Sequence, residues 1–266
     1  RNFRQLKTEE WMPAKGIYDH DKALLDSVLA PLCESDRRLF GSKRTPINDS
    51  KQHLKSKYKS FDCSVMEIAD DIAYGVHDLE DAIAMGIINK ALWQEKVLTQ
   101  LYEIKDFCLH DQLQEITDNL FSLQHFKRKD AIGSLVNALI TSISIQRVNK
   151  QFIEPLLAYN AYLDPAMYQA LEILKSFVLN YVIKSPDLQI LEYRGQQIVM
   201  ELFETFKAGP LRFLPESAKQ LWKAQNGDES REQRVIADYI SSLTDNHALR
   251  LHASLFSSNQ TTPMMG

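Results

Sequence analysis

The sequence predicts an all-α protein. Apolar residues recur at positions i, i+3, i+4 and i+7 along most of the chain, which is the spacing that gives a helix one apolar face. The 266 residues include only nine glycines and nine prolines, too few for the frequent turns of a β-sandwich. With 44% hydrophobic and 25% charged residues, the chain has a globular composition and can form one large domain or two small ones.

The apolar spacing divides the chain into a series of helices. We expect them over residues 20–34, 62–87, 89–109, 111–124, 128–147, 150–159, 164–183, 186–207, 215–224, 229–243 and 245–256. Ser185, Pro186 and Asp187 support one of these starts, because they offer a capping hydroxyl, a proline at the first helical position and an acid in the first turn. Thr244 and Asp245 offer a second cap and a second acid.

Two regions are expected from this series. Residues 1–147 would form a core that contains the helix 62–87 and a basic loop at 36–60. Residues 148–266 would form a C-terminal helical region packed on that core.

Charge, hydropathy and cysteine content exclude several classes of protein. The chain has 31 basic and 35 acidic residues, a net charge of −4, so it has no overall attraction to nucleic acid or to an anionic membrane. No apolar stretch approaches the roughly 20 residues that span a bilayer, so we expect no membrane contact of that kind. Cys33, Cys63 and Cys108 are an odd number without CxxC spacing, which fits buried free thiols in a reducing, cytoplasmic compartment.

Residues 36–60 form a locally basic segment. Its basic residues are Arg37, Arg38, Lys43, Arg44, Lys51, Lys55, Lys57 and Lys59, against Asp36 and Asp49. Its glycine, proline and serines predict a loop or linker, and a solvated connection is one interpretation. The other is a contact for the phosphates of a nucleotide or of single-stranded nucleic acid, because clustered basic residues release counterions when they bind a polyanion. Tyr58 is nearly the only aromatic residue in it, which weakens the prediction of base stacking.

The most informative pattern lies on the helix expected over 62–87. Asp70, Tyr74 and Asp78 are four residues apart, so on an α-helix they occupy one stripe about 80° wide. A separate apolar face is formed by Ile68, Ile72, Val76, Leu79 and Ile83. A solvated helix face explains part of this pattern, but a phenol between two carboxylates on one line also suits a polar binding pocket.

The segment around this stripe, ADDIAYGVHDLEDAI at residues 69–83, closely resembles the signature helix of the deoxyguanosinetriphosphate triphosphohydrolase (dGTPase) family of HD-domain metallohydrolases. The resemblance continues in the family's order along most of the chain. It is carried by residues 13–18, 128–136, 184–186, 195–199, 238–245 and 248–249. The resemblance implies a multi-helix, HD-domain-like bundle.

The resemblance also implies an activity, namely cleavage of a dNTP into a deoxynucleoside and triphosphate. A divalent metal such as Mg²⁺ or Mn²⁺ would activate the attacking water and neutralise charge on the phosphate oxygens. By its place in the signature, Asp70 would bind that metal, Asp78 would accept a hydrogen bond from the 3′-hydroxyl, and Tyr74 would pack against C2′. A homo-oligomer is implied by the resemblance alone.

The family's other metal ligands, a His and a His-Asp doublet ahead of the signature helix, cannot be found in the chain. Three local His-Asp pairs lie in other contexts: His20-Asp21, His77-Asp78 and His110-Asp111. We expect these histidines not to be ligands and His110-Asp111 to lie at the surface. Residues 1–4 are similar to the family segment just after the doublet, so we expect a C-terminal portion of a longer protein. We assign no catalytic residue within it, and alone it should bind metal weakly and hydrolyse nothing.

Four basic residues are candidate phosphate ligands. Arg128 and Lys129 open a predicted helix whose N-terminus offers free backbone N–H groups to a triphosphate, although a solvated basic pair is the alternative. Arg4 and Lys15 are candidates through their family-like neighbours. A further set, Asp238, Tyr239 and Asp245, either lines a pocket or holds helices together, and we favour packing.

Two functions therefore stay open. The first is a dNTP triphosphohydrolase, or the helical substrate-binding part of one. The second is a non-catalytic helical module of the same fold, which acts through protein partners or through single-stranded nucleic acid bound by the basic segment 36–60.

Overall fold

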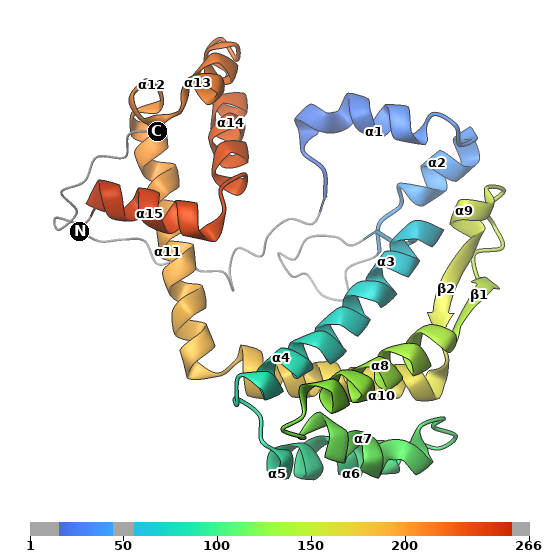
Figure 1. The fold of residues 1–266 in the computed structure, drawn as a ribbon. Coiled ribbons are helices and arrows are strands. Elements are labelled where there is room, and N and C mark those ends of the chain that lie inside the picture. Colours follow the sequence, from blue (N-terminus) through green and yellow to red (C-terminus); the bar gives the residue numbers. More distant parts are fainter. Residues whose placement is uncertain (1–15, 45–55, 257–266) are drawn as a thin grey trace. The chain divides into compact units, whose positions relative to one another are not determined.

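The computed structural model describes residues 16–44 and 56–256 (Figure 1). These residues are mostly helical, and the strands among them form one two-stranded sheet, so the predicted all-α class is confirmed. The chain divides into two compact units, Arg1–Ile183 and Lys184–Gly266. In the described part of the chain, no helix is both long enough and apolar enough to cross a membrane.

The first unit contains most of the elements. Its helices and helical turns are η1 (Asp19–Asp21), α1 (Lys22–Leu29), α2 (Glu34–Phe40), α3 (Phe61–Ile72), η2 (Ala73–His77), α4 (Asp78–Ala84), α5 (Lys90–Trp93), η3 (Gln94–Leu98), α6 (Thr99–Tyr102), η4 (His110–Gln112), α7 (Leu113–Leu120), α8 (His125–Thr141), α9 (Pro155–Ala158), α10 (Pro165–Val178) and η5 (Leu179–Ile183). Its strands are β1 (Ile143–Arg147) and β2 (Tyr159–Leu163). The turns η2, η3 and η5 are π-helical.

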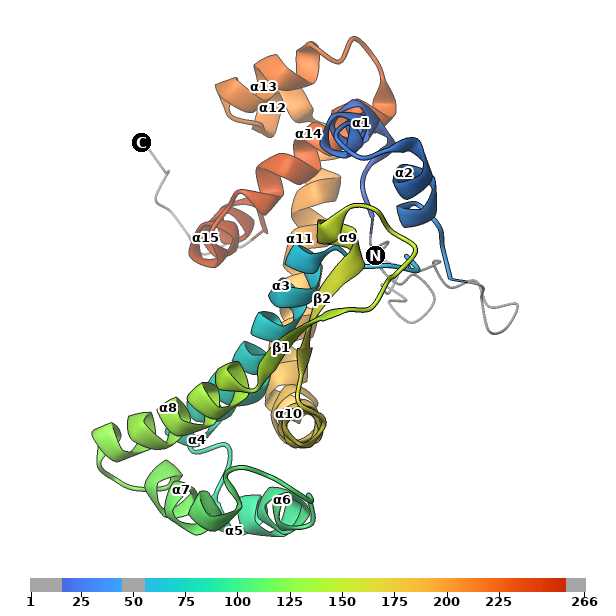
Figure 2. The same ribbon diagram turned by 90° about the vertical axis from the view of Figure 1, so that its right-hand side faces the viewer.

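The helix predicted over 62–87 is present as α3, η2 and α4, which follow one another without a break. Ser60 caps its start, since the Ser60 hydroxyl accepts a hydrogen bond from the Cys63 N–H. Its apolar face is buried as predicted, with Val76 and Leu79 fully inaccessible to solvent. The β2 strand lies beside α3 in both views (Figures 1 and 2), and α10 packs against η2.

The hairpin corrects two of the predicted helices. The helix expected over 128–147 ends at Thr141, and residues 143–147 form β1 instead. The helix expected over 150–159 is reduced to the single turn α9. β1 pairs antiparallel with β2, from Ile143 opposite Leu163 to Arg147 opposite Tyr159. The β-branched and aromatic residues of the two strands suit a pleated, half-buried surface, and pairing with a distant segment decides between strand and helix.

The basic segment 36–60 was predicted as a loop, but its start is helical and is held by hydrogen bonds to a distant part of the chain. The helix predicted over 20–34 is instead α1, and a second helix, α2, follows it. The Asp36 carboxylate of α2 is 1% exposed and accepts hydrogen bonds from the backbone N–H groups of Ile153 (3.1 Å) and Glu154 (2.8 Å). A backbone bridge then pairs Lys43 with Ser56. Residues 45–55 lie outside the described residues.

Helices α5, α6 and α7 lie together below α4 in both views (Figures 1 and 2). Trp93 of α5 is buried, and its indole N–H donates to the Thr117 hydroxyl of α7 (3.1 Å). The helix predicted over 89–109 ends earlier, at Tyr102, and Asp106 adopts the left-handed conformation with φ 59°. The three cysteines are free, but Cys33 and Cys108 are exposed rather than buried.

The second unit is entirely helical over its described residues. Its helices are α11 (Pro186–Ala208), α12 (Pro210–Phe213), α13 (Glu216–Lys223), α14 (Glu229–Ser241) and α15 (Asp245–Phe256). Four of them match predicted helices within two residues at each end. Tyr239 packs edge-on against the buried Phe206 (5.4 Å between ring centroids), and Asp238 pairs with Arg234 (2.7 Å). The Tyr239 contact joins α14 to α11, as the packing interpretation expects, whereas the Asp238 pair lies within α14 itself.

The boundary between the units differs from the predicted boundary between residues 147 and 148. It lies between Ile183 and Lys184. The reason is that β2 packs on α3 and α10 packs on η2, so the residues that follow β1 complete the first unit.

Candidate functional site

The predicted stripe spans a change in helical geometry. Asp70 lies in the last turn of α3, Tyr74 lies in the π turn η2, and Asp78 is the first residue of α4. The N–H of Asp78 donates to the carbonyl of Ala73, five residues earlier, which defines the π turn. Such turns are rare and frequently occur at functional sites. Asp70 is exposed, whereas Tyr74 and Asp78 are half-buried.

The three side chains influence one another electrostatically. Partial burial and the negative charge of Asp78 raise the pKa of Tyr74, although Lys175 acts in the opposite direction. The Tyr74 phenol is therefore protonated at neutral pH and can donate a hydrogen bond. Partial burial raises the pKa of Asp78 as well, and the charges of Asp81 and Asp70 add to this rise, while His77 opposes it.

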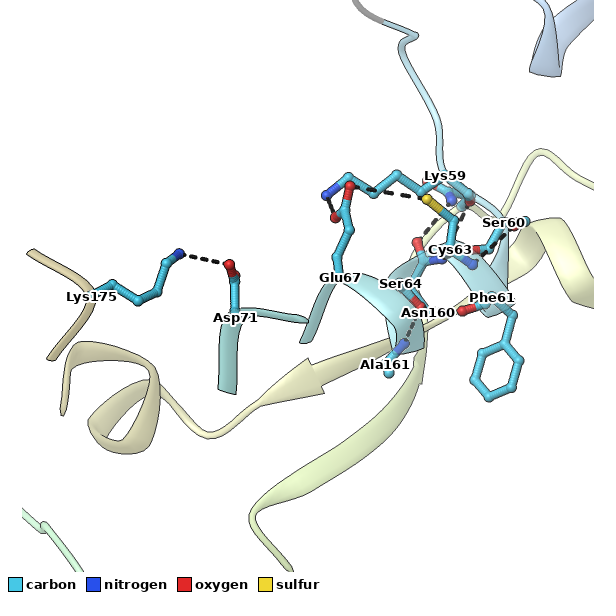
Figure 3. A network of polar contacts seen from close by, with 11 residues as sticks. Lys59, Ser60, Phe61, Cys63, Ser64, Glu67, Asp71, Asn160, Ala161 and Lys175 are labelled. Carbon is cyan, nitrogen blue, oxygen red and sulfur yellow. Dashed lines mark hydrogen bonds and ion pairs between the residues drawn. The ribbon is translucent and has the colours of Figure 1, made fainter. Parts of the chain in front are cut away.

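Lys175 of α10 is part of this environment and was not predicted. Its ammonium group pairs with Asp71 (2.9 Å) and Glu172 (2.7 Å), and Figure 3 shows the bond to Asp71. Burial alone would lower the pKa of Lys175, but the hydrogen bonds to Glu172 and Asp71 outweigh burial and raise it. The sequence holds no signal for this contact, since Lys175 is separated from the stripe by a hundred residues and sits in an ordinary amphipathic helix.

Gly75 allows α10 to approach the stripe closely. A Cβ added to Gly75 would lie 2.8 Å from Cδ1 of Leu171 and 3.3 Å from Cγ of Lys175, both on α10. At such distances a side chain at residue 75 requires these side chains or α10 itself to move. Because Gly75 lies next to Tyr74 in η2, the close approach fixes the middle of the stripe against a rigid helix.

The two predicted phosphate ligands of α8 are not at a helix start. The helix α8 begins at His125, and the N–H of Arg128 already donates to the carbonyl of Gln124. Lys129 pairs with the buried carboxylate of Glu80 (3.1 Å). Nε of Arg128 is buried and has no hydrogen-bond partner within the described ranges. The other two predicted phosphate ligands, Arg4 and Lys15, lie outside the described residues.

The described residues do not by themselves fit a divalent metal ion. Within residues 16–44 and 56–256, no three His, Cys, Asp or Glu side chains come together as a ligand group. The His110-Asp111 pair lies at the surface as expected, with the Asp111 side chain fully exposed. His77 lies 3.9 Å from the Glu80 carboxylate. Asp70 thus offers one carboxylate, where a protein metal site needs about four ligands.

Asp78→Asn is expected to stabilise the fold at neutral pH. Because folding raises the pKa of Asp78, its contribution to stability is full below the ordinary value of 3.8 and is lost as the pH rises through the folded value. At pH 7 the substitution should raise the free energy of unfolding by about half a kcal/mol, a small gain because solvent screens a half-exposed group. Urea unfolding at pH 7 and pH 4 measures it, with Asp62→Asn on α3 as control. A gain that is larger at pH 4 contradicts this account.

Comparison with known proteins shows what the chain is similar to. Residues 161–254 match a family described as a phosphohydrolase-associated domain. The chain is 54% identical over 256 residues to a deoxyguanosinetriphosphate triphosphohydrolase-like protein of Vibrio vulnificus, an alignment that covers 96% of this chain and 58% of that relative. A protein with the same description from Shewanella pealeana is 51% identical over 263 residues, covering 99% of this chain and 59% of the relative.

A third relative, deoxyguanosinetriphosphate triphosphohydrolase-like protein 1 of Vibrio cholerae serotype O1, is 54% identical over 255 residues, or 96% of this chain and 57% of the relative. The chain therefore spans less than three fifths of the length of these curated relatives. The relatives and the matching family are both named for phosphohydrolases. The resemblance to the dGTPase family that the signature helix indicates is confirmed by these relatives.

Proposed function

We propose that the chain is part of a metal-dependent dNTP triphosphohydrolase, which converts a dNTP and water into a deoxynucleoside and triphosphate. The supporting observation is the stripe of Asp70, Tyr74 and Asp78, fixed against α10 in a chain that is 54% identical to a dGTPase-like protein. A phenol and two carboxylates in a partly desolvated setting can recognise a sugar and hold a cation at adjacent positions.

The chain's own residues have separate roles in this proposal. The Asp78 carboxylate accepts a hydrogen bond from the 3′-hydroxyl of the substrate. The protonated Tyr74 phenol forms a flat wall against C2′, where the extra hydroxyl of a ribonucleotide would clash. The ion pair of Lys175 with Asp71 holds the helix that carries both residues against α10.

Asp70 provides one ligand of a divalent Mg²⁺ or Mn²⁺ ion in this proposal. It is exposed at the end of α3, so its carboxylate is free to coordinate. The remaining ligands would have to come from residues outside 16–44 and 56–256, because the described residues hold no further ligand group. A cytoplasmic homo-oligomer would fit this activity and stays part of the proposal.

The second candidate is a non-catalytic helical module that acts through partners. Two observations favour it: the absence of a metal-ligand group from the described residues, and the basic residues that surround a cleft beside α3. Assays for triphosphate release separate the candidates. They should use the 266-residue chain and a hybrid protein, defined as the V. vulnificus relative in which this chain replaces the 256 matching residues. Turnover by the hybrid but not by the 266-residue chain supports the enzyme. An inactive, folded hybrid supports the non-catalytic module.

Asp78→Ala is expected to weaken the use of nucleotides by the hybrid, and Tyr74→Ala is expected to reduce its selectivity for deoxynucleotides. Loss of a hydrogen bond to the Asp78 carboxylate should raise the activation free energy for dGTP by about 2 kcal/mol, which lowers kcat/KM roughly thirtyfold. Tyr74→Ala should raise the use of GTP relative to dGTP, because the wall against C2′ is removed. Steady-state kinetics with both nucleotides measures these effects, and Asp62→Ala on α3 is the matched control. No loss of kcat/KM in Asp78→Ala, together with equal effects on dGTP and GTP in Tyr74→Ala, would assign these residues to packing.

A further inference from the structure

A second cleft lies on the face of α3 that turns toward the hairpin. It has a volume of about 370 Å³, within the usual range of small-molecule sites. Ser64, Glu67 and Asp71 follow one another at helical spacing along its wall. Asp70, Tyr74 and Asp78 are not among its lining residues, so this cleft is separate from the stripe.

Two of its basic residues, Arg44 and Lys57, are held near each other by backbone hydrogen bonds. The backbone bridge between Lys43 and Ser56, together with the hydrogen bond from the Lys57 N–H to the Ser42 carbonyl (2.9 Å), places Arg44 and Lys57 on adjacent antiparallel strands of chain. Both side chains line the cleft and are exposed. Among the described residues, no carboxylate forms an ion pair with either. The Lys57 ammonium lies 5.3 Å from the centre of the Tyr58 ring, a contact that leaves its charge uncompensated by an anion.

The acids of the cleft already have partners. Glu67 is paired with Lys59, and Asp71 is paired with Lys175, as Figure 3 shows. The same figure shows the Ser64 hydroxyl accepting the N–H of Ala161, which fixes β2 against α3. Because these acids are compensated, the electrostatic character of the cleft is set by Arg44 and Lys57.

The fold adds aromatic side chains to this basic site. Tyr58 is anchored edge-on against the buried Phe152, with ring centroids 5.0 Å apart. Tyr162 from β2 and Tyr168 from α10 line the same cleft and remain accessible, at 41% and 53% exposure. The sequence places Tyr58 nearly alone, but the structure brings two more rings from beyond residue 150. Aromatic faces beside clustered cations are the features that bind bases and phosphates together.

We infer that this cleft binds a nucleotide, with its phosphates at Arg44 and Lys57 and its base against Tyr162 and Tyr168. Cations and accessible rings that line one cleft supply contacts for both the phosphates and the base of a nucleotide. A single nucleotide matches the cleft volume of about 370 Å³ better than a strand does. This site does not depend on the stripe, on a metal ion or on the proposed hydrolysis.

Isothermal titration of the 266-residue chain with dATP in EDTA tests the inference. EDTA removes divalent ions, so a metal-dependent site does not contribute. We expect dATP to bind at least tenfold more tightly than tripolyphosphate or deoxyadenosine. The double variant Arg44→Ala, Lys57→Ala should weaken dATP binding at least tenfold and reduce its salt dependence. Lys105→Ala, Lys127→Ala removes two exposed charges away from the cleft and should leave the affinity within twofold.

Two further variants test whether the cleft recognises the base and whether its binding is independent of the stripe. Tyr168→Ala should weaken dATP binding severalfold without changing tripolyphosphate binding. Because the Tyr168 ring is exposed, we expect the variant to fold normally. Asp70→Asn should leave dATP binding unchanged in EDTA, whatever its effect on hydrolysis. The inference is overturned by tripolyphosphate binding as tightly as dATP, by equal effects of the two double variants, or by absent dATP binding. Tight binding of a twelve-residue oligodeoxyadenylate without dATP binding would also overturn it and indicate a nucleic-acid surface.

Discussion

Asp70→Asn is expected to abolish triphosphate release by the hybrid protein. The substitution keeps the size of the side chain but removes its negative charge, so a divalent ion loses a carboxylate ligand. We expect a loss of kcat/KM on the order of a thousandfold or more, since a metal ion contributes several kcal/mol of charge stabilisation. Release of triphosphate from dGTP with Mn²⁺ measures the loss. The fold should be unaffected, because Asp70 is exposed.

Asp71→Asn is the matched control, because the two aspartates are neighbours with different surroundings. Asp71 is half-buried and bound to Lys175, so its substitution should cost an ion pair and change activity far less. Circular dichroism should show unchanged helicity for both variants. Loss of activity and metal affinity in Asp71→Asn, with neither lost in Asp70→Asn, would move the metal role to Asp71 and contradict the proposal.

The signature helix could be predicted because all of its information is local. Its buried face repeats at helical spacing through Ile72, Val76 and Leu79, and it begins at a serine that caps it. The same holds for α15, where the Thr244 hydroxyl accepts the N–H of His247 (3.3 Å) at the predicted start. Spacing places the stripe on this helix, but it does not predict the π turn η2, which changes the angle between the three side chains.

The hairpin could not be predicted because its information is not local. Residues 143–147 continue the apolar spacing of α8, and they form a strand because residues 159–163 are available to pair with them. The start of α8 was also predicted wrongly. Its start at His125 lies three residues before the predicted one, and this shift takes Arg128 and Lys129 away from the free N–H groups of the helix N-terminus.

The partners of the site were missed for the same reason. Lys175, Tyr162 and Tyr168 reach α3 through tertiary packing, and nothing in their sequence neighbourhood distinguishes them. The basic segment was recognised by composition, but its relation to a cleft depends on the bridge between Lys43 and Ser56. Composition therefore indicated the charge of this site, and only the fold indicated its shape and its aromatic walls.

Gly75→Val is expected to destabilise the first unit by about 3 kcal/mol, at the upper end for overpacking. The first added carbon would already lie 2.8 Å from Leu171, which is buried, and valine adds two more carbons. A gain of a few tenths of a kcal/mol from the better helix propensity of valine does not offset this cost. Relief of the clash must move the buried Leu171 side chain or the helices that carry it and Tyr74, and we expect Tyr74 to shift and the preference for deoxynucleotides to fall with stability.

Gly133→Val on α8 is the matched control, because a Cβ at Gly133 would meet nothing within 4 Å. It should change the free energy of unfolding by less than about half a kcal/mol, since only helix propensity differs. Urea unfolding of both variants, followed by the ratio of dGTP to GTP turnover in the hybrid, measures the two effects. If Gly75→Val unfolds at the same urea concentration as Gly133→Val, α10 does not approach η2 as closely as the structure shows. The close packing of α10 that we propose as a support for the stripe would then be wrong.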